Sequence, residues 1–178
     1  LAHYGVKVGS ELVLDPQNAA FPVAVNRDVN GYTVQDIQAV DYPFFIDVRS
    51  SAMSQDNPVT TNLPAVSFND ASVVELDEEK NAGRAAEVLL SSSEQSWTTA
   101  DINVVPDFQT YPEWGFPTGE TRQPYPLGVA VQGQFESYFK GKQPPQPQVE
   151  GQAAPAVVLD QSPANARLVV FGSARSEE

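Results

Sequence analysis

Apolar residues in this chain occur only in short runs, and proline or glycine separates many of them. No run approaches the roughly 18 consecutive apolar residues that a membrane-spanning helix needs. Hydrophobic residues nevertheless make up 41% of the chain, which is enough for a packed core. A length of 178 residues fits one domain, because domains usually contain ~100–200 residues. We therefore expect a single packed domain, residues 1–178, in which no segment crosses a membrane.

Several of the short runs are β-branched or alternate in polarity, as strands do. Asn30-Gly31 is the dipeptide that best fits the positive φ angles of a two-residue hairpin turn, so we expect a β-hairpin around it. Periodicity alone does not distinguish strand from helix for residues 71–76 and 85–90. Ser96 is placed to cap a short helical turn that starts at Trp97. The remaining runs predict strands over residues 6–8, 12–14, 21–25, 32–37, 42–48 and 127–131.

Residues 167–173, Arg-Leu-Val-Val-Phe-Gly-Ser, form an apolar run that ends in Gly-Ser. Central parallel strands of α/β domains often lead into their C-terminal loops in this way. We therefore expect an α/β domain with a mixed, mostly parallel sheet, in which residues 168–171 form an inner strand. At the other end, residues 1–4 followed by Gly5 predict the last turn of a helix. The chain also begins without methionine, so we expect a fragment of a longer protein.

Residues 103–126 combine many prolines with aromatic side chains. Regular secondary structure is improbable there, but a long loop rich in aromatic residues is expected to be anchored, either to the body of the domain or to a partner. Exposed aromatic side chains also bind sugars and peptides. The candidate interaction residues in and around this segment are Trp97, Tyr111, Trp114, Phe116 and Tyr125.

Residues 140–155 contain the sequence Gln-Pro-Pro-Gln-Pro-Gln and few apolar residues. Such a composition cannot bury enough surface to hold a segment against the body of the domain. We expect a flexible, extended excursion there.

The chain offers little catalytic chemistry. It has no cysteine and one histidine, His3, which excludes thiolate nucleophiles and sulfur-ligated metals. It also lacks the G-x-S-x-G elbow and phosphate-binding glycine loops. We expect no catalytic residue, metal or cofactor, although two carboxylates distant in sequence could still converge. The net charge of −13 argues against nucleic acid, which is bound through basic residues.

Four segments, taken in order, resemble a known family. Residues 1–6 and 12–17 are similar to its "LxxYGI…vvDpq" start, and residues 89–97 to its "LLxTSxxSW" segment. Residues 126–131 resemble "pLaVAv", and residues 166–173 resemble "aRlvVvGdS". The family is that of the GldG-like auxiliary proteins of ABC transporters, and the resemblance is to their extracytoplasmic domain.

The resemblance implies a fold similar to flavodoxin or to glutamine amidotransferases, without their catalysis. It also implies a domain on the extracytoplasmic side of the cell membrane, with ABC permease and ATPase subunits as partners. The leading hypothesis is thus a non-catalytic auxiliary domain that mediates subunit or substrate interaction. A carbohydrate- or peptide-binding module is the alternative, and an enzyme is the third.

Overall fold

The computed structural model describes residues 1–29, 31–142 and 159–173, and every strand pair in this part of the chain is antiparallel. Two single-turn 3-10 helices, η1 (Ala2–Tyr4) and η2 (Ser50–Ala52), accompany the strands. The strands are β1 (Val6–Leu14), β2 (Phe21–Val29), β3 (Tyr32–Val40), β4 (Phe45–Arg49), β5 (Ala65–Asn69), β6 (Ser72–Leu76), β7 (Ala85–Ser91), β8 (Trp97–Thr99), β9 (Pro126–Gly133) and β10 (Ala166–Phe171).

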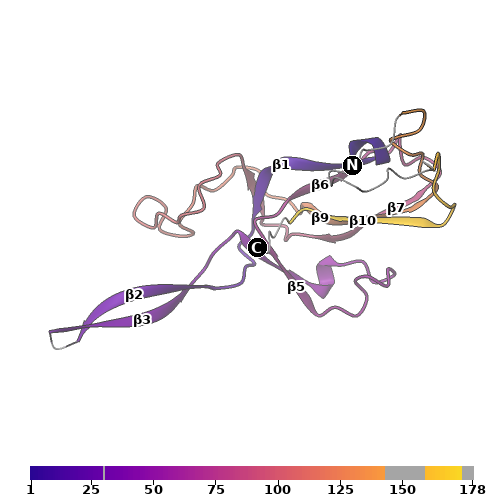
Figure 1. Cartoon of the computed structure of the whole chain (residues 1–178). Helices are drawn as coiled ribbons and strands as arrows, with labels where there is room; N and C mark the ends of the chain where they lie inside the picture. The colour runs from indigo at the N-terminus through magenta and orange to yellow at the C-terminus, as the bar shows by residue number, and fades with distance from the viewer. Residues whose placement is uncertain (30, 143–158, 174–178) are drawn as a thin grey trace, which may run out of the picture.

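Two three-stranded sheets form the body of the molecule (Figure 1), one in the order β6-β1-β8 and the other in the order β10-β9-β7. The two sheets pack against each other through β6 and β9. Alternate side chains of each strand point into the space between the sheets. Val6 and Val74 of the first sheet meet Val129, Val131 and Val170 of the second there, and all five side chains are buried.

This architecture corrects the expected fold class. The described chain is nearly all antiparallel β-structure, and it is not an α/β domain with a mostly parallel, flavodoxin-like or glutamine-amidotransferase-like sheet. The expected inner parallel strand is β10, which runs antiparallel to β9 and pairs with no other strand in the described part of the chain. Its apolar run is buried on one face alone, since Val169 and Phe171 on the other face are 39% and 42% exposed.

The predicted hairpin is confirmed. β2 and β3 pair from Phe21 with Val40 to Val29 with Tyr32, and Gly31 has the positive φ, 83°, that the tight turn requires. The hairpin projects from the body (Figure 1), and the other element pairs with extensive contacts do not include it. Every described side chain of β3 is exposed except that of Val40, so nearly all of this strand faces solvent.

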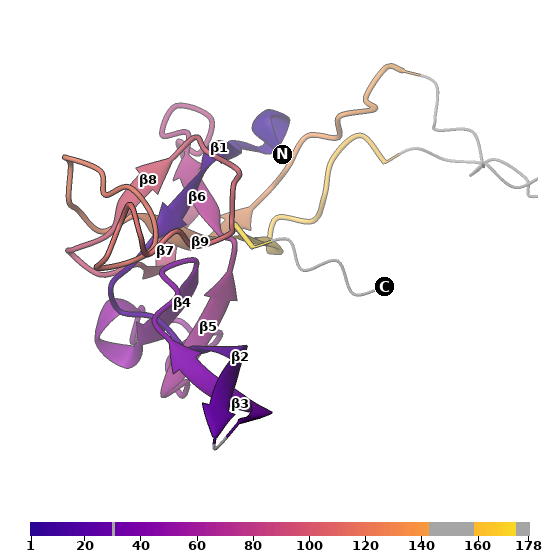
Figure 2. The ribbon, with the colours of Figure 1, turned by 90° about the vertical axis from the view of Figure 1, so that its left-hand side faces the viewer.

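A smaller two-stranded sheet, β4 with β5, packs beside the body (Figure 2). Ile46, Val48 and Phe68 of this sheet join Leu89 and Leu90 of β7 in one buried cluster. The sequence analysis missed β5. The helical turn predicted at Trp97 was also wrong, because Trp97 begins β8 and pairs with Leu14.

Two further predictions concern the N-terminal turn and the segment 140–155. The helical turn before Gly5 is present as the 3-10 helix η1, with Gly5 at φ 82°. Of the excursion predicted over 140–155, only residues 140–142 belong to the described part, where they form a turn. Residues 143–155 lie outside the described residues.

Asp70, in the link between β5 and β6, gives a testable prediction about pH. It has a positive φ of 51°, and partial burial raises the pKa of its carboxyl above the ordinary value of 3.8. A raised pKa in the folded state means that Asp70 favours folding at low pH and that this contribution is lost as the pH rises through the folded pKa. Asp70→Asn, which keeps the preference for positive φ, should therefore have a higher Tm than the parent at pH 7.

The measurement is thermal unfolding of both proteins at pH 3 and pH 7, with the exposed Asp56→Asn as the matched control. The gain from Asp70→Asn should shrink toward pH 3, where the parent carboxyl is protonated. A gain of the same size at both pH values would contradict the assignment.

Candidate interaction surface

Asp15 lies at the end of β1 and is completely buried. Its carboxylate accepts hydrogen bonds from the backbone N–H groups of Gln17 (2.8 Å) and Ser93 (2.6 Å) and from the Ser93 hydroxyl (2.6 Å), with the Ser96 hydroxyl 3.2 Å away. These donors compensate the cost of burying a charge. No histidine takes part in the cluster, so it lacks the base that activates a serine nucleophile. The arrangement joins the end of β1 to the chain before β8.

Trp97 follows this cluster directly and is 1% exposed. Its Nε1–H donates to the carbonyl oxygen of Pro117 at 3.1 Å, and the guanidinium of Arg122 stacks over its ring at 4.1 Å from the centroid. Both partners lie in the loop formed by residues 100–125, which connects β8 with β9. The indole therefore anchors this loop to the body of the domain.

The five candidate aromatic residues are not all in one place. Trp97 and Phe116 are buried in the same cluster, and the half-buried Trp114 packs against it. Tyr125 packs against a different cluster, that of β4, β5 and β7. Tyr111 lies within the loop, and its side chain is 38% exposed. Burial thus leaves Tyr111 as the most accessible of the five for a partner.

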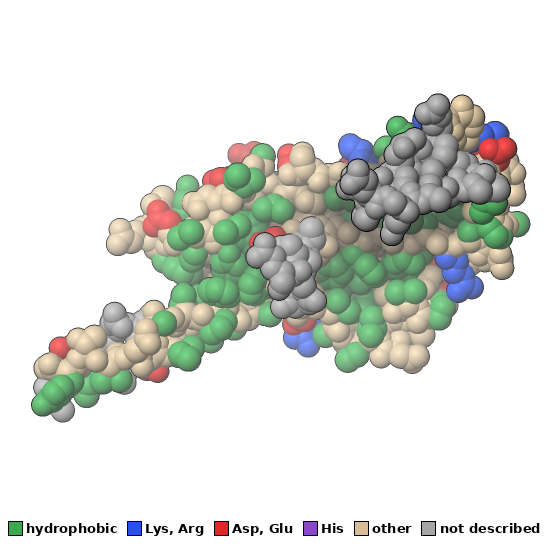
Figure 3. Space-filling view, viewed as in Figure 1, with side chains coloured by type: hydrophobic (Ala, Val, Ile, Leu, Met, Phe, Trp, Pro, Cys, Tyr) green, Lys and Arg blue, Asp and Glu red, His purple; other side chains and the backbone are tan. Residues whose placement is uncertain are grey.

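Exposed apolar side chains gather instead on two projections at one end of the molecule. One is the β2–β3 hairpin and the other is the loop 100–125, and both extend to the left of the body in Figure 1. Figure 3 shows hydrophobic side chains along the hairpin. We call these two segments together the projecting end. Its exposed large hydrophobic side chains are Val29, Tyr32, Val34, Ile37, Ile102, Val104, Val105, Phe108 and Tyr111.

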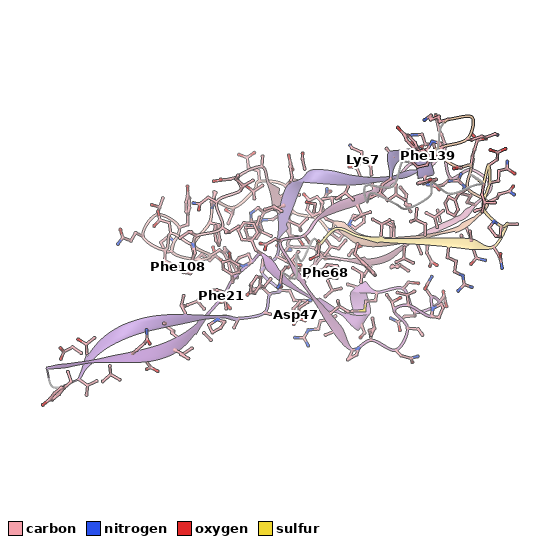
Figure 4. The ribbon with its side chains drawn as sticks, viewed as in Figure 1. Lys7, Phe21, Asp47, Phe68, Phe108 and Phe139 are labelled. Carbon is pink, nitrogen blue, oxygen red and sulfur yellow. The ribbon has the colours of Figure 1, made fainter. Side chains whose placement is uncertain are left out.

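Tyr42 fixes the bases of the two projections relative to each other. Its ring packs against Phe21 at the start of the hairpin, with the centroids 5.0 Å apart. Its hydroxyl donates to the carbonyl oxygen of Val104 in the loop at 2.6 Å. Phe21 and Phe108 mark the hairpin base and the loop in Figure 4. Burial, followed by the nearby charge of Asp70, raises the pKa of Tyr42, so its hydroxyl keeps the proton that it donates.

The sequence analysis missed the hairpin as a candidate surface. The available signal was its pattern, because Tyr32 and Val34 point to one side of β3 whereas Ile37 points to the other. Such a strand leaves apolar side chains exposed whichever face packs against the body.

No group of three or more histidine, cysteine, aspartate or glutamate side chains in the described part of the chain is arranged to hold a metal ion. Among the same residues, no helix has the length and apolar character needed to cross a membrane.

Comparison with known proteins gives one match. The family model described as "ABC-type uncharacterized transport system" matches residues 1–176. No curated protein and no solved structure matches the chain.

The Asp15 cluster gives a second testable prediction. Asp15→Asn turns one acceptor oxygen into an N–H₂ donor that faces the N–H and hydroxyl donors of Ser93. Losing a buried, charge-assisted network of this kind should lower the free energy of unfolding by about 2–4 kcal/mol. Urea denaturation measures the loss. The exposed Asp56→Asn should change stability by no more than ~0.5 kcal/mol, and an equal effect of both variants would show that the cluster is not stabilising.

Proposed function

We infer the function from a premise that the family match supplies: the chain belongs to the ABC-type uncharacterized transport system family. It is accordingly an auxiliary component of such a system, associated with a membrane assembly. We propose that it is a non-catalytic domain on the extracytoplasmic side, and that the projecting end contacts the permease of the assembly. Within the family, the resemblance of its four sequence segments to GldG-like proteins is part of the same proposal.

The observation that carries the proposal is the concentration of exposed apolar side chains on the two projections. Tyr32 and Ile37 are 76% and 73% exposed on the hairpin, and Ile102 is 83% exposed on the loop. Large apolar side chains grouped on an exposed surface are typical of protein interaction sites. An isolated two-stranded hairpin is marginally stable in water, so a partner that packs against it would also stabilise it.

The hairpin is also electrostatically suited to an apolar partner. Residues 21–40 carry only Arg27, Asp28 and Asp36 as charged residues, whereas the whole chain has a net charge of −13. Burying this segment requires the desolvation of these three charges, whose net charge is −1. An extracytoplasmic domain reaches the ATPase only through the permease, and so we propose the permease as the direct partner.

The carbohydrate- or peptide-binding alternative depended on stacking by exposed aromatic residues. The ring of Trp97 is buried and stacked by Arg122, which leaves no face for a sugar. Trp97 therefore does not support this alternative. An enzymatic function has no support in the Asp15 cluster, whose oxygens are occupied by structural donors.

The contact with the permease is tested by changing one exposed hairpin residue at a time in the full-length protein. Tyr32→Ser and Ile37→Ser remove apolar side chains from opposite faces of β3, and both should leave the Tm of the domain nearly unchanged because they are exposed. Co-purification with the permease should fall about tenfold for at least one of them. Leu1→Ser, at a 55% exposed site, is the matched control and should have no effect. Full retention of the permease by both hairpin variants would refute the contact.

The extracytoplasmic placement is tested separately by thiol labelling. The chain has no cysteine, so Asp56→Cys at an exposed position introduces the first thiol of this domain. A membrane-impermeant maleimide should modify it in intact cells whose outer layers are permeable to the reagent. Labelling that requires lysis of the cell membrane would place the domain in the cytoplasm and overturn the assignment.

A further inference from the structure

The strand β10 has an open edge in the described part of the chain. It pairs with β9 on one side, and no described strand pairs with the other side. The bond from the Gly172 N–H to the Leu127 carbonyl oxygen fixes the ladder pattern. In this pattern the backbone groups of Arg167, Val169 and Phe171 point away from β9. These three residues therefore present a row of N–H and C=O groups, the template to which a further strand can pair.

Cavities lie along both faces of this edge. A cavity of about 380 Å³ lies beside Arg167 and Leu168, and Tyr4 and Phe135 form part of its wall. A second one of about 320 Å³ lies between β10 and β5, where Phe171 meets Phe68. A third, of about 120 Å³, adjoins Val169 and Arg167.

The second and third cavities share a lining residue. Both include Val59, a residue of the segment between η2 and β5 that is 41% exposed. Together they form a shallow, mainly apolar groove over the outer face of β10. Figure 3 shows hydrophobic side chains in a recess there. A strand that pairs with the open edge would place alternate side chains in this groove and the others toward the first cavity.

Arg167 provides a separate observation. Among the cationic side chains that the structure describes, it alone has no ion pair, hydrogen bond or ring contact. Four of the others form ion pairs, and the remaining three bind carbonyl oxygens or aromatic rings. The ion-paired side chains are Lys7, Arg49, Lys80 and Lys140, and the others are Arg84, Arg122 and Lys142. An unpaired cation is unexpected in a chain with 23 acidic and 10 basic residues.

We propose that the open edge of β10 is a binding site for an extended peptide segment of a partner protein. The segment adds as a strand to β10, carries apolar residues at alternate positions for the groove, and places a carboxylate opposite Arg167. Backbone hydrogen bonds supply affinity in this mode of recognition, and the flanking cavities supply selectivity. The site is distinct from the projecting end, so it does not depend on the contact proposed there.

A second copy of this chain fits the edge less well. Pairing of two β10 edges brings two bodies of net charge −13 side by side, closer than the screening length of ~8 Å at physiological ionic strength. In the antiparallel pairing that uses all three outward residues, Arg167 lies opposite Phe171 of the second copy, which supplies no carboxylate. A separate segment with one acidic residue satisfies both the backbone edge and the cation.

The experiment uses synthetic probes and the 178-residue chain. The first probe is an eight-residue fluorescent peptide in which valine alternates with threonine and one central valine is replaced by glutamate. The second carries lysine in place of glutamate, and the third is the glutamate peptide methylated at alternate backbone nitrogens. Fluorescence anisotropy should show binding of the glutamate peptide at about 1–100 µM. The lysine peptide should bind about tenfold more weakly, and the methylated peptide should not bind.

Two variants locate the site. Val169→Pro removes an outward N–H that β9 does not use, a change that edge strands tolerate, and it should abolish binding while the protein stays folded by thermal unfolding. Arg167→Gln should reduce the difference between the glutamate and lysine peptides to less than about twofold. Lys7→Gln, which removes an exposed strand cation from the other sheet, should preserve both the binding and the difference.

Three outcomes would overturn the proposal. One is binding of the methylated peptide as tight as that of its parent, and another is unchanged binding by Val169→Pro. The third is concentration-dependent dimerisation of the chain that Val169→Pro abolishes, measured by sedimentation velocity, which would make a second copy the occupant. If the hairpin variants failed to release the permease, only the proposed function would be affected. The peptide site and its variants at Arg167 and Val169 lie in β10 and do not involve β2 or β3.

Discussion

The buried carboxylate of Asp15 is the interaction on which the arrangement of this domain depends. A fully buried charge is tolerated only with several donors around it, and here Gln17 and Ser93 supply them. Because Ser93 is 78 residues away along the chain, the same bonds hold the end of β1 against the segment that leads into β8. Next to this contact, Leu14 of β1 pairs with Trp97 of β8. The loop 100–125 starts from this fixed point, and the position of one projection follows from it.

The family-like sequence segments meet in pairs in the folded chain. Residues 12–17 contain Asp15, and residues 89–97 contain the serines that bind it. Residues 126–131 belong to β9 and residues 166–173 contain β10, and the two strands pair from Gly128 with Phe171 to Gly133 with Ala166. Each of these segments, far apart in sequence, thus supplies one half of a tertiary contact. The body of the domain is built by these contacts, whereas the hairpin and the loop extend from it.

The sequence predicted the positions of most strands, but it did not predict how they pair. The dipeptide Asn30-Gly31 determines a local hairpin, so the pairing of β2 with β3 could be predicted from adjacent residues. The direction of β10 could not, because its run of apolar residues suits a buried parallel strand as well as an edge strand with a groove over one face. The expected α/β fold came from that interpretation of residues 167–173 and from the flavodoxin-like or glutamine-amidotransferase-like fold that the family resemblance implied. β5 was missed because it is only five residues long, and Val66 and Phe68 become part of a core only against β4 and β7.

The roles of the candidate aromatic residues likewise depend on tertiary contacts that the sequence does not reveal. The sequence identified Trp97 and Phe116 as candidate interaction residues, and it favoured anchoring of the loop over binding of a ligand. Their burial with Phe44 assigns them to anchoring, and a loop held in this way can present other side chains without losing its position. The exposed residues that we propose for contact, such as Tyr32 and Ile37, looked ordinary in sequence because alternating strands are expected to bury one face.

The charge of the chain explains how such surfaces can remain exposed. A net charge of −13 makes copies of the domain repel one another, and repulsion counteracts the association that open strand edges and apolar side chains otherwise promote. The repulsion acts over about one Debye length, ~8 Å at physiological ionic strength. A nine-residue hairpin strand extends ~30 Å and reaches beyond that distance, so the hairpin can meet a partner while the acidic body stays apart. The β10 edge lies within the body, and there the unpaired Arg167 offers an acidic partner segment a local attraction that the β10 edge of a second copy does not supply.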